Sequence, residues 1–230
     1  MPSEPTTPPL AKGQEKSNIS AVAATVTGVP PRVRFSIVHW AATGAVRLSY
    51  RCWTRVAVVL CPEDSVGERV AESLHIPLPD RLNMSWVTDN LAVGGRVRPG
   101  DIKVLALVGV THVVDTRSEY CDDRAALARE HIALLHLPAP DTYPLTVEQL
   151  MEGASWVQQQ LQQGGRVLIH CEHGVGRSVL LTCATLVYSG MHAHDALQLV
   201  QLKRWQASPN HRQVGRLEEF EKHCRSRANA

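Results

Sequence analysis

The sequence has few aromatic residues and no pattern typical of a metal site or a disulfide framework. Aromatic side chains make up 5% of its 230 residues. There is no CxxC pair and no HExxH motif, and the six cysteines are scattered: Cys52, Cys61, Cys121, Cys171, Cys183 and Cys224. Disulfide frameworks and zinc sites use closely spaced ligands, so neither is expected. No metal or other cofactor is predicted.

Long hydrophobic runs and a strong net charge are also lacking. No signal-peptide pattern stands at the N-terminus, which favours a reducing, cytoplasmic compartment. The uncharged run at residues 35–46 is far shorter than the roughly 20 residues that a membrane span needs. A net charge of +2 is too small to argue for a nucleic-acid partner, and none is expected.

Acidic residues are missing between Glu15 and Glu63, and the composition changes within this stretch. Residues 1–33 are rich in Pro, Ser and Thr without hydrophobic periodicity, which predicts a disordered tail. Residues 34–62 are basic, and residues 63–85 resemble a connector broken by prolines.

The basic segment, residues 34–62, has an amphipathic pattern. Arg47, Arg51 and Arg55 recur every four residues and would share one face of a helix. Such a helix could lie on an anionic membrane surface, giving peripheral membrane association. The alternative, which we favour, is a helix packed on the rest of the protein with its arginines in water.

The chemically richest stretch is residues 167–178, with the sequence VLIHCEHGVGRS. Its order predicts a buried strand, a glycine-containing loop and the start of a helix. Backbone N–H groups of such a loop and the helix dipole form an anion-binding cradle. Cys171 would lie at the floor of this cradle, where a thiolate is favoured. Arg177 adds a planar group that can hold two phosphate oxygens.

The segment His170-Cys171, five residues, Arg177-Ser178 resembles the active-site loop of cysteine-based protein tyrosine phosphatases. In its modest size the chain resembles members of the dual-specificity branch of this superfamily. The resemblance covers residues 86–226. It implies that Cys171 is the nucleophile and Arg177 the phosphate-binding cation. It also implies that Ser178 assists departure of the thiolate and that His170 supports the loop through backbone hydrogen bonds. Contact with substrate is expected from the remaining loop residues, mainly through backbone N–H groups: Glu172, His173, Gly174, Val175 and Gly176.

A proton donor is expected in the loop that contains Asp141. This residue follows a predicted strand and two prolines, about thirty residues before Cys171, as the general acid does in the family. A carboxylic acid there can protonate the leaving group and later activate water. The alternative role for Asp141 is a turn cap. Asp115, the competing acid, is expected to have a structural role in hydrogen bonding.

Strands that alternate with helices predict an α/β fold with a central, mostly parallel sheet flanked by helices, similar to protein tyrosine phosphatases. Residues 86–228 would form this catalytic domain. The expected activity is hydrolysis of a phosphomonoester through a phosphocysteine intermediate, with no metal ion.

Three hypotheses remain for the function of the site. The favoured one is a dual-specificity phosphatase acting on phosphorylated proteins or on small phosphomonoesters. The second is a lipid phosphatase at a membrane surface, such as one for phosphatidylglycerophosphate. Ser118-Glu119-Tyr120 matches the loop of those lipid enzymes only in part, and Glu172 should repel phosphoinositides. The third is a phosphate-binding module without catalysis.

Overall fold

The structure is a computed structural model in which Ser49, Cys52, Val70, Ser73 and residues 82–228 are described. The predicted tail lies outside the described residues. So do the basic segment and the connector, apart from those four isolated residues and residues 82–85. Within the described part of the chain, no helix is both long and apolar enough to cross a lipid bilayer.

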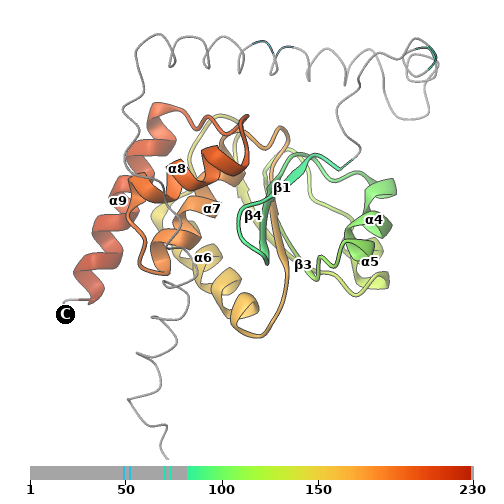
Figure 1. Cartoon of the computed structure of the whole chain (residues 1–230), viewed down its shortest axis with the longest axis horizontal. Helices are drawn as coiled ribbons and strands as arrows, with labels where there is room; N and C mark the ends of the chain where they lie inside the picture. Colours follow the sequence, from blue (N-terminus) through green and yellow to red (C-terminus); the bar gives the residue numbers. More distant parts are fainter. Residues whose placement is uncertain (1–48, 50–51, 53–69, 71–72, 74–81, 229–230) are drawn as a thin grey trace, which may run out of the picture. The chain divides into compact units, whose positions relative to one another are not determined.

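Five strands form one mixed sheet in the order β1-β2-β5-β3-β4. Only β1 is antiparallel to its neighbour, and the other four strands are parallel (Figure 1). The predicted α/β fold with a mostly parallel sheet is therefore confirmed. The strands are β1 Met84–Trp86, β2 Leu91–Gly94, β3 His112–Arg117, β4 Ala133–Ala139 and β5 Val167–His170.

Helices lie on both sides of this sheet. In Figure 1, α4 and α5 are on one side, and α6, α7, α8 and α9 are on the other. A short 3₁₀ helix, η1, precedes α4. The bounds are η1 Pro99–Asp101, α4 Ile102–Leu107, α5 Arg124–Arg129, α6 Val147–Gln162, α7 Arg177–Tyr188, α8 Ala193–Lys203 and α9 His211–Ala228.

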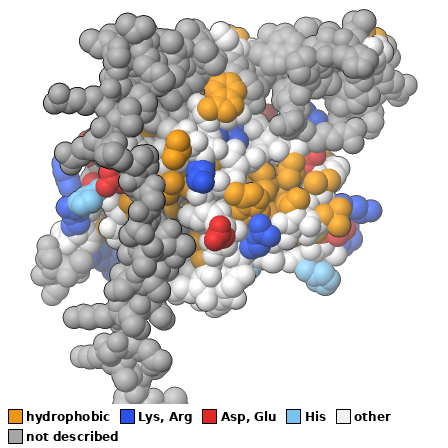
Figure 2. Space-filling view, viewed as in Figure 1, with side chains coloured by type: hydrophobic (Ala, Val, Ile, Leu, Met, Phe, Trp, Pro, Cys, Tyr) orange, Lys and Arg blue, Asp and Glu red, His pale blue; other side chains and the backbone are white. Residues whose placement is uncertain are grey.

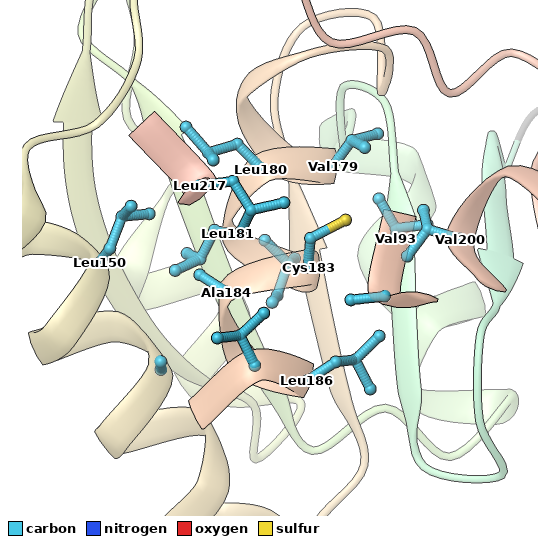
Figure 3. Close-up of a cluster of buried hydrophobic side chains, with 14 of the residues drawn as sticks. Val93, Leu150, Val179, Leu180, Leu181, Cys183, Ala184, Leu186, Val200 and Leu217 are labelled. Atoms are coloured by element: carbon cyan, nitrogen blue, oxygen red, sulfur yellow. The ribbon is translucent and has the colours of Figure 1, made fainter. Parts of the chain in front are cut away.

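Alternating side chains of the strands build two cores, one on each side of the sheet. In β5, Val167 and Ile169 join the larger core beneath α6–α9, whereas Leu168 joins the smaller core beneath α4 and α5. A strand that is buried on both faces must be apolar at consecutive positions, as the run at residues 167–169 is. The larger core is shown in Figure 3.

Helix α7 is buried on every side. All of its residues from Arg177 to Val187 are buried, and it packs against α6, α8, α9 and the sheet. Its two threonines donate their hydroxyl groups to backbone carbonyl oxygens of the helix itself, at Ser178 and Leu181. Because α7 begins at the end of the cysteine loop, this packing fixes the loop to the core.

The N-terminal edge of the fold differs from expectation. Strand β1 begins at Met84, so Met84 and Ser85 belong to the sheet rather than to the predicted connector. Helix α4 is covered on one face only: Leu107 is 85% exposed, whereas Ile102 and Leu105 face the smaller core. Figure 2 shows hydrophobic side chains gathered on the side of the molecule where α4 lies.

Candidate active site

The site lies where the parallel strands end at one edge of the sheet. β5 is the central strand, and the cysteine loop, residues 171–177, follows it directly. The loop after β3 carries Glu119, and the loop after β4 carries Asp141. Parallel strands bring their carboxyl ends to the same edge, so three segments distant in sequence meet there.

Cys171 is buried, with only 3% of its surface exposed. Its Sγ accepts a hydrogen bond from the backbone N–H of Gly174 at 3.2 Å. The Ser178 hydroxyl lies 3.3 Å from the same sulfur and 3.2 Å from the carbonyl oxygen of Gly94. The sulfur therefore faces hydrogen-bond donors on the loop and on the first turn of α7.

Arg177 is held by two hydrogen bonds to Glu119, which the sequence analysis did not assign to the site. The guanidinium donates to the two carboxylate oxygens of Glu119 at 2.6 and 2.7 Å and to the carbonyl oxygen of Ala139 at 2.8 Å. These bonds lower the pKa of Glu119 to about 2. Burial opposes the charge of Arg177, but Glu119 and the neighbouring negative groups raise its pKa overall.

Asp141 also contacts the guanidinium of Arg177. Its Oδ1 lies 3.2 Å from Nη2 of Arg177, and its side chain is half exposed. The structure thus brings together three of the predicted catalytic side chains, from Cys171, Arg177 and Asp141, around one cavity.

Gly174 shows why the loop needs glycine at this position. Its φ angle is +67°, in the left-handed region, and an added Cβ would lie 2.7 Å from the carbonyl oxygen of Gly94. The carbonyl oxygen of Gly174 accepts a hydrogen bond from Nε of Arg204 at 2.7 Å. Arg204 also donates to the side chains of Asn83 and Ser85, so this buried arginine joins the loop to the N-terminal edge of the fold.

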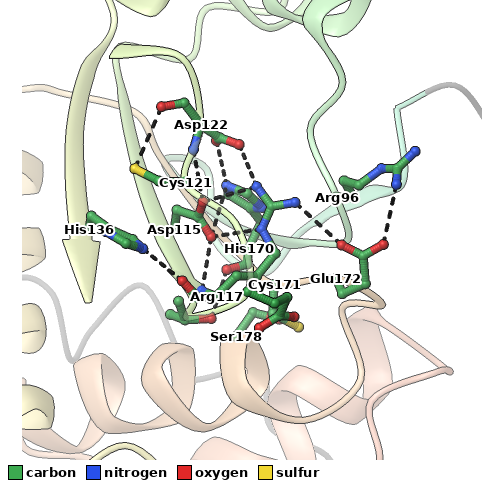
Figure 4. A network of polar contacts seen from close by, with 12 residues as sticks. Arg96, Asp115, Arg117, Cys121, Asp122, His136, His170, Cys171, Glu172 and Ser178 are labelled. Carbon is green, nitrogen blue, oxygen red and sulfur yellow. Dashed lines mark hydrogen bonds and ion pairs between the residues drawn. The ribbon is translucent and has the colours of Figure 1, made fainter. Parts of the chain in front are cut away.

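A buried network of charged side chains lies next to the cysteine loop (Figure 4). Arg117, which is fully buried, donates to both carboxylate oxygens of Asp115 at 2.9 Å and to Asp122 at 2.5 Å. The expected structural role of Asp115 is therefore confirmed. Burial alone would raise the pKa of Asp115, but these bonds and the charge of Arg117 lower it.

His170 belongs to this network, and its partner differs from the expected one. Nε2 of His170 lies 2.8 Å from the carboxylate of Asp122, so the side chain contacts an acid rather than the backbone. The backbone carbonyl of His170 accepts a hydrogen bond from the Thr116 hydroxyl at 2.9 Å. Asp122 could not be predicted as the partner, because 48 residues separate it from His170 along the chain.

The Glu172 side chain is also part of the network and does not line the cavity. Its carboxylate lies 3.3 Å from Nη1 of Arg117 and 3.5 Å from Nη1 of Arg96. The expectation that this acid repels phosphorylated head groups therefore loses its basis, because two arginines neutralise the carboxylate and hold it away from the cavity.

The cavity combines predicted and unpredicted residues. From the cysteine loop, it is lined by Cys171, His173, Val175, Gly176 and Arg177. Asp141 lines it together with four residues that were not predicted as site residues: Thr142, Ser208, Asn210 and Gln213. The last three lie at and before the start of α9, and their sequence indicates a turn before a helix but not that this turn faces the cavity.

Among the residues that the structure describes, two groups of side chains have the composition of a metal site. They are Asp115, Cys121 and His136, and Asp115, Asp122 and His170, each with potential ligand atoms within 4.8 Å of one another. Asp115 is shared by both groups and is already bonded by Arg117. The positive charge of that guanidinium opposes a cation at either place.

Comparison with known proteins agrees with this geometry. Residues 97–223 match the family described as "Dual specificity phosphatase, catalytic domain". The chain is 28% identical over 176 residues to dual specificity protein phosphatase 1B of Arabidopsis thaliana, covering 71% of this chain and 95% of that relative. It is 31% identical over 142 residues to dual specificity protein phosphatase 22 of Mus musculus, covering 61% of this chain and 74% of that relative.

Solved structures are similar to the same region. The active form of Tk-PTP aligns with a TM-score of 0.58 at 29% identity, covering 61% of this chain and 97% of that structure. PTPMT1 aligns with a TM-score of 0.60 at 22% identity, covering 64% of this chain and 98% of that structure, which shows a shared fold alone. Since the family match spans more than half of the chain and includes the cysteine loop, the chain belongs to the dual specificity phosphatase family.

Proposed function

We propose that this phosphatase removes phosphate from phosphorylated proteins, with Cys171 as nucleophile, Arg177 as phosphate-binding cation and Asp141 as acid and base. The observation that carries the proposal is the convergence of these three side chains on one cavity. The cysteine sulfur there faces the N–H of Gly174, and the carboxylate of Asp141 lies beside the guanidinium of Arg177.

In the first step, the Cys171 thiolate attacks phosphorus and the bond from phosphorus to the ester oxygen breaks. The departing oxygen takes a proton from Asp141, so an alcohol or phenol leaves instead of an anion. The charge on the transferring phosphoryl group is stabilised by the Arg177 guanidinium and by backbone N–H groups of the loop that includes Glu172, His173 and Val175.

In the second step, water attacks the phosphocysteine, Asp141 accepts a proton from that water, and the sulfur leaves as a thiolate. The Ser178 hydroxyl has one proton and lies within reach of both the sulfur and the Gly94 carbonyl oxygen. Turning that proton toward the sulfur stabilises the leaving thiolate. Ser178 therefore assists the second step more than the first.

Protein substrates are favoured by the chain's relatives. The relatives in Arabidopsis thaliana and Mus musculus are named dual specificity protein phosphatases. Phosphotyrosine and phosphoserine or phosphothreonine peptides are therefore the substrates to test first, with small aryl phosphates as mechanistic probes.

The Cys171→Ser variant tests the nucleophile. Its hydroxyl is a much weaker nucleophile than a thiolate, so we expect turnover of p-nitrophenyl phosphate to fall at least about 1000-fold. The phosphate site remains, so the variant should still bind a phosphopeptide, as measured by calorimetry. The buried Cys183→Ser variant serves as the control for loss of a thiol away from the cavity. Turnover by Cys171→Ser at the wild-type rate would rule out the phosphocysteine route.

The Asp141→Asn variant tests the acid. Phenyl phosphate has a poor leaving group and needs protonation, whereas p-nitrophenyl phosphate needs it less. We expect kcat to fall about 100-fold for the first and less than about tenfold for the second. Equal losses for both substrates would exclude Asp141 as the proton donor and leave it the alternative role of a turn cap.

A further inference from the structure

The acid loop, residues 140–145, is tied to the first turns of α9 by three hydrogen bonds. Asn210 donates through Nδ2 to the carbonyl oxygen of Thr142 at 2.7 Å. Gln213 donates to the carbonyl oxygen of Tyr143 at 3.4 Å, and Arg216 donates to that of Leu145 at 2.9 Å. Asn210, Gln213 and Arg216 are spaced by three residues and so lie on one face at the start of α9. Three successive donors of the helix therefore meet three carbonyl groups of the loop.

The backbone of the acid loop requires such support. Thr142 has a φ angle of +68°, in the left-handed region that a β-branched residue seldom adopts. One local bond, from the N–H of Tyr143 to the carbonyl oxygen of Pro140, closes the turn around it. A backbone in this conformation persists only where surrounding contacts determine it. The hydrogen bonds from Asn210, Gln213 and Arg216 supply such contacts at Thr142 itself and at two residues that follow it.

Thr142 directly follows Asp141, so its conformation sets where the carboxylate points. The Asp141 side chain is half exposed and therefore not fixed by packing on all sides. Asn210 and Gln213 also line the cavity beside Asp141. Any movement of the Thr142 carbonyl away from Asn210 would carry the carboxylate away from the leaving oxygen of a substrate.

We propose that Asn210 is a positioning residue for the general acid, assisted by Gln213 and Arg216, and that these contacts hold Asp141 at the leaving group. This proposal rests on the role of Asp141 given under the proposed function. It adds that the start of α9 sets the rate of protonation through hydrogen bonds to the backbone of the acid loop.

The Asn210 amide allows this role to be separated from folding. Its Oδ1 accepts a hydrogen bond from the N–H of Gln213 at 3.0 Å, which caps the start of α9. The contact with the acid loop uses the other end of the amide, because Nδ2 donates to the carbonyl oxygen of Thr142. Asn210→Ser keeps an oxygen that can cap the helix, but serine is too short to reach the Thr142 carbonyl. The substitution thus removes the contact with the loop while it retains a capping residue.

The experiment compares kcat of Asn210→Ser and wild type for phenyl phosphate and p-nitrophenyl phosphate, with Asp141→Asn measured alongside. We expect Asn210→Ser to lower kcat about tenfold for phenyl phosphate and less than about twofold for p-nitrophenyl phosphate. A second variant, Arg216→Met, removes the hydrogen bond to Leu145 and leaves the capping residue Asn210 in place. Like Asn210→Ser, it should lower kcat more for phenyl phosphate than for p-nitrophenyl phosphate. Its control, Glu219→Gln, removes the 2.9 Å ion pair with Arg216 but keeps the donor to the loop.

The outcomes separate the two proposals. If Asp141→Asn shows the leaving-group dependence and neither α9 variant does, the positioning role is wrong and the role of Asp141 stands. If an α9 variant slows both substrates equally, it acts on phosphate binding or folding, and the positioning role is again wrong. If Asp141→Asn itself shows no such dependence, the assignment of the acid fails and the positioning role fails with it.

Discussion

Arg177 depends on Glu119 for its orientation, because two of its hydrogen bonds end on that carboxylate. Glu119→Gln removes the negative charge and leaves only one oxygen that can accept. We expect kcat/KM for p-nitrophenyl phosphate to fall about tenfold, which corresponds to about 1.4 kcal/mol of transition-state stabilisation. Steady-state kinetics would measure this change, with Glu218→Gln on the exposed face of α9 as the control. An unchanged kcat/KM would mean that Ala139 and Asp141 suffice to orient the guanidinium.

Sequence reasoning found the residues of the site that lie within one local motif. Cys171, Arg177 and Ser178 fall in a single loop and helix start, so this one stretch predicted an anion-binding loop and showed the resemblance to phosphatases. Glu119 and Arg204 were missed as parts of the site because their partners are 58 and 30 residues away along the chain. Their contacts exist only after the strand ends meet at one edge of the sheet.

Helices α6 and α7 pack closely at Gly153. A Cβ added there would lie 2.7 Å from a methyl carbon of Leu137 and 2.8 Å from one of Leu181. Gly153→Ala should therefore overpack this contact and lower the free energy of unfolding by about 1–3 kcal/mol.

The matched variant is Gly215→Ala in α9, where an added Cβ meets no atom within 4 Å. Alanine in an exposed helix interior should raise the free energy of unfolding by about 0.5–1 kcal/mol. Urea denaturation of both variants measures the difference. A stabilising Gly153→Ala would show that the leucine side chains move aside without cost.

Most elements could be predicted because their hydrophobic pattern is local. Helix α6, Val147–Gln162, has such a pattern, and Thr146 caps it as part of a capping box with Gln149. Strand β1 was missed because three residues carry no measurable alternation, and its place depends on pairing with β2. The end of β3 is equally hard to predict, because the strand closes with Thr116 and Arg117, whose polar side chains interrupt the hydrophobic pattern.

The whole protein should lose stability in acid partly through Glu119 and Asp115. The pKa of Glu119 falls from an ordinary value of 4.5 to about 2 on folding, and that of Asp115 is also lowered. A lowered pKa contributes stability above the unfolded value, and this contribution is lost as the pH falls through the folded value. For Glu119 the loss should therefore occur between about pH 4.5 and 2.

Urea denaturation at neutral pH, pH 4 and pH 3 would measure this dependence in the wild type and in Glu119→Gln. We expect the wild type to be the more stable protein at neutral pH, and the difference between the two to shrink as the pH falls. A difference that stays constant over this range would show that the ion pair with Arg177 adds no pH-dependent stability.

Arg204 has a practical consequence for preparing the protein. Its guanidinium donates to the side chains of Asn83 and Ser85 at one end of the fold and to the carbonyl oxygen of Gly174 in the cysteine loop. A recombinant fragment trimmed to the family boundary at residue 97 would discard both N-terminal acceptors, together with β1 and β2. An expression fragment that begins at Leu82 would keep both acceptors, and with them the contacts through which Arg204 joins the cysteine loop to β1.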